Sequence, residues 1–290
     1  MSDKKVWFGP ENHLTQIPAP HSDLDASSVG FSASGTYLNG GGYEIDSPYA
    51  HREYNFSWPS LTTEEAYGIA QFASGIYSND VLYYLDPFST TNVVTEWVSA
   101  PALAYGDPLA VPRGPDGTPC GQQTGLVDYT PDSVYGYPDQ GVSYRLYDQN
   151  PGGRNYAYFG KVLVPPNYDL YFTMRSSTAT GGTEVTGTLS DTDLDNTRYI
   201  NSTSLSSNAR VLGLEYQYEG QVEFNLRSIM ATVVPHTNPA SITTGGFVLG
   251  RGSSGLRFQG RPQITQYSAP EAVDVVGVSA KMIETGWWEQ

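Results

Sequence analysis

Short runs of alternating apolar and polar residues recur along the 290-residue chain, and turn residues separate them. The clearest run carries Tyr54, Phe56 and Trp58 at alternate positions, with polar residues between them. Because successive side chains of a strand point to opposite faces, this pattern predicts a strand over Arg52–Trp58 with one buried face. Residues 39–42, Asn-Gly-Gly-Gly, predict a tight turn before it, since Asn and Gly tolerate positive φ.

One helix is predicted, over Thr63–Ala73, a segment without proline. Thr62 precedes Glu65 by three residues, which is the spacing of a capping box, and Gly75 suits the C-terminal end. A thin apolar stripe at helical spacing gives the helix one face for packing. The stripe consists of Ala66, Ile69, Ala70 and Ala73.

A strand is also predicted over Val81–Leu85, so the first part of the chain fits a small β barrel or sandwich covered by one helix. Beyond residue 140, turn residues separate further candidate strands, and their spacing favours a β-sandwich or jelly roll. These strands are Ser143–Tyr147, Ala157–Val164, Tyr168–Met174, Glu184–Leu189, Val211–Tyr218 and Gln221–Leu226. Three more are expected near the C-terminus, at Phe247–Leu249, Leu256–Phe258 and Val273–Ile283.

Seven isolated prolines lie between Ala100 and Pro138, a composition that predicts a linker, or a long loop with one strand near Leu126–Tyr129. The chain is therefore expected to contain four segments. They are a first β domain at 1–110, a Pro/Gly-rich linker at 111–140, a β-sandwich domain at 141–236 and C-terminal strands at 237–290.

Composition supports a mostly-β fold, because 31 Gly and 20 Pro suit short strands and argue against long helices. Thirty acidic and 15 basic residues give a formal net charge of −15, which disfavours nucleic acid and anionic membranes as partners. No stretch approaches the ~18 apolar residues of a membrane span. No signal peptide is visible either, so we expect the chain to be made and folded in a cytoplasm.

Signatures of catalysis are scarce. Cys120 is the one cysteine, and we expect a free thiol in a loop, because a catalytic thiol needs a nearby His to lower its pKa. The four histidines lack the spacing of a zinc site, and no nucleotide-binding or serine-hydrolase motif occurs. The sequence therefore predicts neither an enzyme nor a bound cofactor.

Residues 191–196, Asp-Thr-Asp-Leu-Asp-Asn, match the start of a calcium loop, in which alternate oxygens surround a hard cation. Asp191, Asp193 and Asp195 are thus weak candidates for calcium ligands. The pattern is incomplete, since Asn replaces the required glycine and Ser202 stands where the bidentate Glu should be. A solvated turn is the better interpretation.

Tyrosines are frequent in the predicted sandwich domain, and flat rings can stack on the C–H faces of sugars. The candidate glycan contacts are Tyr156, Tyr158, Tyr168 and Tyr171. The alternative is that these rings fill strand positions and subunit contacts. Trp287 and Trp288 at the C-terminal end are candidate oligomer contacts, because two tryptophans are expected to dock against apolar surface.

Several motifs, in this order, resemble those of minor tail proteins of actinobacterial siphophages, of the distal-tail-protein type. They are 6–10 (Val-Trp-Phe-Gly-Pro), the glycines 40–42, 54–58 (Tyr-Asn-Phe-Ser-Trp), 83–88 (Tyr-Tyr-Leu-Asp-Pro-Phe), 165–168 (Pro-Pro-Asn-Tyr), 252–258 and 284–288 (Glu-Thr-Gly-Trp-Trp). The similarity spans most of the chain and is least evident in the central Pro/Gly segments.

This resemblance implies a belt domain that forms a ring, usually a hexamer, at the end of the tail tube. It also implies a peripheral β-sandwich that is galectin-like or carbohydrate-binding-module-like, and no catalytic residues. The partners would be further copies of the chain, the tail tube and other tail-tip proteins, within the virion tail tip. Residues 237–290 would return to the belt domain if the sandwich is inserted with adjacent ends.

Three functions follow as hypotheses. The first is a structural ring subunit that joins the tail tube to the tip, which agrees with open sheet edges and a thinly striped helix that need neighbours. The second is a module that binds host cell-wall glycan through its tyrosines. The third is an envelope-polysaccharide depolymerase, for which 30 acidic residues offer too many carboxylate pairs to choose among.

Overall fold

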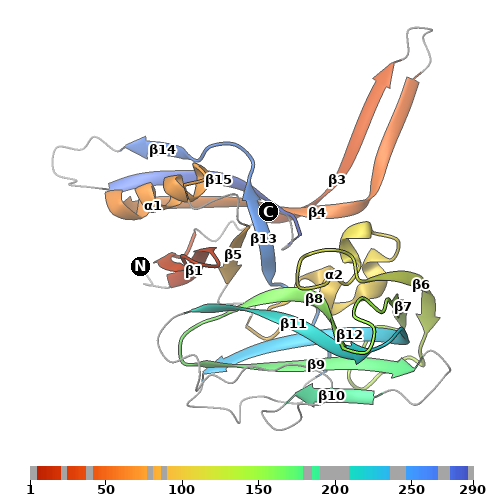
Figure 1. Ribbon diagram of the computed structural model, residues 1–290. Helices are drawn as coiled ribbons and strands as arrows, with labels where there is room; N and C mark the ends of the chain where they lie inside the picture. The colour runs from red at the N-terminus through yellow and green to blue at the C-terminus, as the bar shows by residue number, and fades with distance from the viewer. Residues whose placement is uncertain are drawn as a thin grey trace.

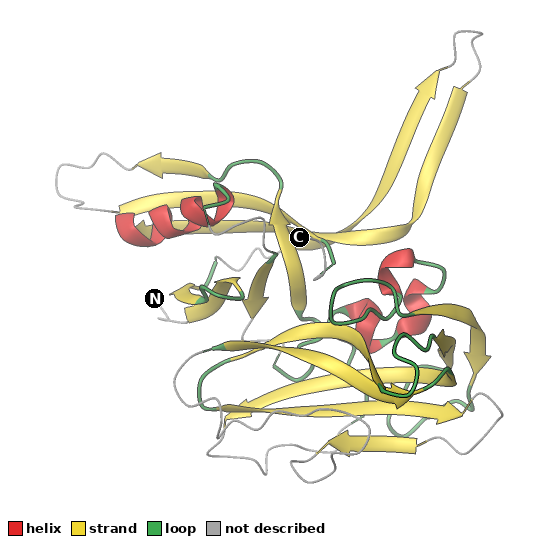
Figure 2. Cartoon of the chain, in the orientation of Figure 1, coloured by secondary structure: helices red, strands yellow, loops and turns green. Residues whose placement is uncertain are grey.

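The protein is described from a computed structural model, which places residues 5–20, 25–36, 42–76, 81–85, 90–178, 185–189, 209–235, 246–266 and 275–286. Strands make up 54% of the structure and helices 11%, and the strands form several antiparallel sheets (Figures 1 and 2). The predicted mostly-β class is thereby confirmed, whereas the galectin-like character of the sandwich stays a prediction.

The larger sheet has the strand order β2–β1–β5–β13–β15–β4–β3, and β14 pairs with β15. Its strands are β1 Lys5–Pro10, β2 Thr15–Pro18, β3 Asp25–Thr36, β4 Gly42–Thr62, β5 Leu82–Leu85, β13 Ser253–Phe258, β14 Gln263–Gln266 and β15 Val275–Glu284. The C-terminal strands β13 and β15 therefore lie between strands from the first third of the chain (Figure 1).

The strand predicted around Phe56 is confirmed as part of β4. Tyr54, Phe56 and Trp58 are all buried, and the ring of Phe56 stacks 5.8 Å from Tyr54 and 5.4 Å from Trp58. This aromatic row forms the centre of one apolar core together with Phe8 of β1 and Met282 of β15. Alternation in the sequence thus becomes one buried face of the larger sheet.

Helix α1, Thr63–Ala73, has the predicted bounds and covers this core. Its capping box forms, since the Glu65 amide donates to the Thr62 hydroxyl at 3.2 Å and the Thr62 amide donates to the Glu65 carboxylate at 2.9 Å. The predicted stripe was partly wrong. The buried residues are Ala66, Ile69 and Phe72, because the Phe72 ring reaches Phe8, with centroids 5.7 Å apart.

The second region contains a five-stranded sheet, β10–β9–β12–β7–β6, and a two-stranded sheet, β11–β8. Their bounds are β6 Gly121–Asp128, β7 Gln140–Leu146, β8 Arg154–Val164, β9 Tyr168–Thr178, β10 Val185–Leu189, β11 Arg210–Glu219 and β12 Val222–Pro235. Buried residues of both sheets share one apolar core, which makes this region a sandwich (Figure 1). All six strands predicted here between 143 and 226 are found.

Three short helical segments connect the two regions along the chain. They are α2 Glu96–Ser99 and the 3₁₀ helices η1 Pro101–Ala104 and η2 Pro108–Ala110. Periodicity did not predict α2, because one turn is too short to show a helical repeat. The strand expected at Phe247–Leu249 is absent: the Phe247 amide donates instead to the Tyr135 carbonyl at 2.6 Å, outside any strand ladder.

The Pro-rich segment is packed rather than extended. It contains β6, which pairs with β7, and a loop over 129–139 that Arg227 of β12 holds in place. The Arg227 guanidinium donates to the Pro138 carbonyl at 2.7 Å and to the Thr130 carbonyl at 3.2 Å. The four-segment division of the chain stays a prediction.

The two regions meet along β5, whose four residues are all buried. Leu82 and Tyr84 lie in the core of the larger sheet, whereas Tyr83 and Leu85 lie in the core of the sandwich. Because successive side chains alternate between faces, this short strand contributes to both cores at once.

The most prominent feature of the outline is a two-stranded ribbon that we call the arm, formed by residues 28–36 of β3 and 42–52 of β4 (Figure 1). Within the arm, β4 pairs with β3 alone among the described strands, since the pairing of β4 with β15 stops at Glu53. The ribbon leaves the body of the protein and projects away from both cores (Figure 2). The predicted turn at its tip falls largely outside the described residues.

Candidate functional site

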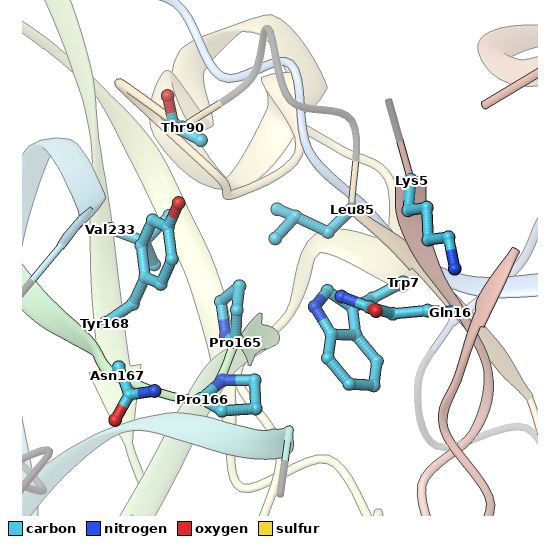
Figure 3. Close-up of a pocket in the computed structure, with 10 residues that line it drawn as sticks. All are labelled: Lys5, Trp7, Gln16, Leu85, Thr90, Pro165, Pro166, Asn167, Tyr168 and Val233. Carbon is cyan, nitrogen blue, oxygen red and sulfur yellow. The ribbon is translucent and has the colours of Figure 1, made fainter. Parts of the chain in front are cut away.

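A cavity of about 580 Å³ lies where the edge of the larger sheet meets the sandwich (Figure 3). Its volume is within the range of pockets that hold small molecules. One wall comes from β1, β2 and β5, and the other from the turn between β8 and β9. We call this cavity the seam pocket.

The sheet wall follows from alternation along β1. Val6 and Phe8 are buried in the core of the larger sheet, so Lys5 and Trp7 point to the opposite face. Trp7 is paired with Gln16 of β2 on one side and with Leu85 on the other. Because directly paired residues share a face, these three side chains form a row across the sheet, as Figure 3 shows.

The turn wall is built by Pro165, Pro166, Asn167 and Tyr168. The Tyr168 amide donates to the Pro165 carbonyl at 3.3 Å, which closes a four-residue turn. Asn167 has a φ of 61° and is the one residue other than glycine with positive φ in the described part of the chain. Proline followed by a residue with positive φ is the pattern of a type II turn, and Asn tolerates that geometry better than most residues.

Hydrogen bonds to the sandwich fix the back of the pocket. The Val233 amide of β12 donates to the Thr90 carbonyl at 3.0 Å, which joins the segment after β5 to the five-stranded sheet. The neighbouring Thr232 hydroxyl donates to the Thr91 carbonyl at 2.7 Å. Both walls therefore rest on hydrogen-bonded backbone.

The chemistry of the lining suits binding. Trp7 and Tyr168 supply rings, Gln16 and Asn167 supply amides, and Lys5 supplies a positive charge. The ten lining residues that the structure describes carry no carboxylate, imidazole or thiol, which are the groups that most often transfer protons in catalysis.

The four candidate tyrosines do not form one platform. Tyr156 and Tyr158 alternate with buried residues of β8 and share its outer face. Tyr171 lies between the buried Leu170 and Phe172, on the outer face of the opposite sheet. Tyr168 lines the seam pocket, so only Tyr156 and Tyr158 are neighbours on one surface.

The remaining candidates fall outside the described residues. This applies to Asp191, Asp193 and Asp195 of the calcium pattern and to Trp287 and Trp288. Among the residues that the structure does describe, no three His, Cys, Asp or Glu side chains come together as a metal site.

Cys120 is free, as predicted, but it is fully buried in the sandwich core. Burial raises the pKa of its thiol from 9.0 to about 12. A thiol in this environment stays protonated near neutral pH, which is the opposite of an activated nucleophile.

In the described part of the chain, no helix combines the length and apolarity that a membrane crossing requires.

No family model, curated protein or solved structure matches this chain.

Sequence reasoning missed the sheet wall of the seam pocket. The alternation of Trp7 with Val6 and Phe8 was the available signal that Trp7 faces away from the first core. The partner wall follows residue 164, and nothing in the local sequence shows that these segments meet.

Proposed function

We propose that this chain is a non-enzymatic structural subunit of a bacteriophage tail tip, which assembles with copies of itself into a ring that joins the tail tube to the tip. The observation that supports this proposal most is the arm. The resemblance to distal tail proteins supplies the biological setting, and the arm supplies a physical reason for assembly.

A two-stranded ribbon alone is marginally stable in water, because it buries little apolar surface for the backbone it orders. The arm has β3 on one edge and an unshared stretch of β4, 42–52, on the other, among the strands described. Unpaired strand edges are templates for pairing with another chain. A neighbouring subunit that covers the arm would satisfy these backbone groups.

The register of the arm is irregular, which also favours a specific partner over indiscriminate stacking. Pairing shifts between Gly30 and Ser32, where β4 advances from Ala50 to Asp46. The intervening stretch contains Pro48, which has no amide hydrogen to donate. Bulges and edge prolines limit uncontrolled strand pairing, so the arm is expected to accept a matching surface only.

The experiment is to measure the mass of the purified chain by light scattering and to image it by negative-stain electron microscopy. We expect a closed ring with a central channel. Since each copy carries a formal charge of −15, assembly should strengthen as added salt screens the repulsion between copies. A chain that stays monomeric at every protein and salt concentration, alone and with tail-tube protein, contradicts the proposal.

A matched variant tests the arm itself. Residues 29–51 are replaced by an Asn-Gly turn, which joins the paired residues Ser28 and Arg52. This variant should stay folded, because the two apolar cores are untouched, and it should remain monomeric. If it forms the same ring as the unaltered chain, the arm is not the assembly element.

A further inference from the structure

We propose that the seam pocket binds a short saccharide, held between Trp7 on the sheet wall and Tyr168 on the turn wall. This inference is independent of ring assembly, because it rests on the pocket alone. It also differs from the tyrosine platform expected from the sequence, three of whose four members lie elsewhere.

The geometry provides an apolar surface on each side of a ligand. Trp7 and Leu85 lie in one row of the sheet, and Pro165 and Pro166 lie across from them, with Tyr168 farther along the turn wall (Figure 3). A pyranose ring has C–H faces that pack on aromatic and proline rings and hydroxyl groups that point outward along its edge. A slot with apolar walls and polar groups around them matches that distribution.

The polar groups are of the kind that recognise hydroxyls. The amides of Gln16 and Asn167 can each donate and accept, so one amide can bond two adjacent hydroxyl groups. Lys5 adds a donor with a positive charge in a protein whose net charge is −15. Lys5 is the one charged group among the described lining residues, and its ammonium favours a neutral or acidic sugar over a cationic one.

The turn wall is preorganised for this task. The positive φ of Asn167 is held by the closed turn and by the two prolines before it, so the backbone of the turn does not have to become ordered on binding. A proline-rich peptide is the main competing ligand, since aromatic grooves also bind such peptides. The two amides favour a sugar, because a polyproline segment offers carbonyl acceptors but lacks hydroxyl donors for the amide oxygens.

The test uses the full chain and saturation-transfer NMR, which reports the ligand protons that touch the protein and tolerates large assemblies. The probes are maltotriose, cellotriose, chitotriose and a trigalacturonate, together with a proline-rich decapeptide. We expect transfer to the ring C–H protons of at least one saccharide and none to the peptide.

Three variants locate the binding. Trp7→Ala should weaken it about tenfold or more, through loss of one wall. Because Trp7 also packs on the sandwich core, a second variant leaves the packing intact: Asn167→Gly keeps the positive φ and removes only the amide. It should weaken binding about three- to tenfold. The control is Tyr67→Ala, since Tyr67 is an exposed aromatic residue of α1 outside the pocket and should not matter.

The proposal is overturned by any of three results. The first is no transfer to any of the four saccharides at millimolar concentration. The second is saccharide binding that persists unchanged in both Trp7→Ala and Asn167→Gly. The third is transfer to the proline-rich peptide that the two pocket variants abolish.

Discussion

The larger sheet and the sandwich both have apolar sheet faces to bury, and they cover these faces in different ways. The sandwich covers the inner faces of its two sheets with one another, and its core draws on both. The larger sheet covers one face with a single helix, α1, and extends an arm that neither core supports. Sheets that cover one another need no partner to bury their inner faces, whereas a ribbon such as the arm is stable only as far as its neighbours complete it.

The largest expected effect comes from the centre of the larger sheet. Phe56→Ala removes a buried ring that stacks between Tyr54 and Trp58, and it should cost about 3–5 kcal/mol. Hydrogen exchange would show which strands lose stability in this variant. If the two regions differ as described, β4 and β15 exchange faster while β7 and β12 are protected as before. Equal acceleration in both regions would mean that they unfold as one unit.

The next effect lies in the sandwich. Arg227→Met leaves the Pro138 and Thr130 carbonyls without their donor and should cost roughly 2–4 kcal/mol in urea unfolding. The matched control is Arg145→Met, because the Arg145–Glu223 ion pair is 42% and 43% exposed and is worth about 0.5 kcal/mol or less. Similar losses for the two variants would argue against a buried anchor for the 129–139 loop.

The pH dependence of stability tests whether Cys120 is buried in the sandwich core. Cys120→Ala should cost about 1–2 kcal/mol at neutral pH, by loss of a buried sulfur. The pKa of the thiol is 9.0 when exposed and about 12 when folded, so its contribution is complete below pH 9. As pH rises from 9 toward 12, the unfolded chain loses its proton first and the folded state loses stability. Unfolding curves of the two proteins should therefore converge, and a constant gap would contradict the burial.

The smallest effect concerns the cover of the larger sheet. Thr62→Ala removes the N-cap of α1 and should lower stability by about 1 kcal/mol. Glu65→Ala breaks the same capping box, so the double variant should cost less than the sum of the two single losses. Thermal unfolding of the four proteins measures this coupling, and strict additivity would show that the box does not act as a unit.

Local signals explain what the sequence could predict. The period of two around Phe56 and the capping box at Thr62 act over a few residues, so strand and helix could be located without knowledge of the fold. The exceptions were also local. Phe72 is buried in place of Ala70 and Ala73 because it also lies three residues after Ile69 and its ring reaches the core, and 247–249 bonded to a loop instead of a neighbouring strand.

The candidate site shows the opposite case. Tyr156, Tyr168 and Tyr171 were grouped because they share one predicted domain. The face of the sheet that each ring reaches depends instead on whether its position in its own strand points inward or outward. Trp7 and Tyr168 line one pocket only through the pairing of β1 with β5 and the packing of both regions. Such a meeting depends on long-range topology, which single-sequence periodicity does not contain.

The strand β5 has a mechanical consequence. The side chains on its two faces pack into separate cores, and its edges are hydrogen-bonded to β1 and β13. Pulling the sandwich away from the larger sheet would have to extract both faces and break both ladders together. We therefore expect a rigid joint that transmits load, so that a pull on the sandwich reaches the larger sheet undamped.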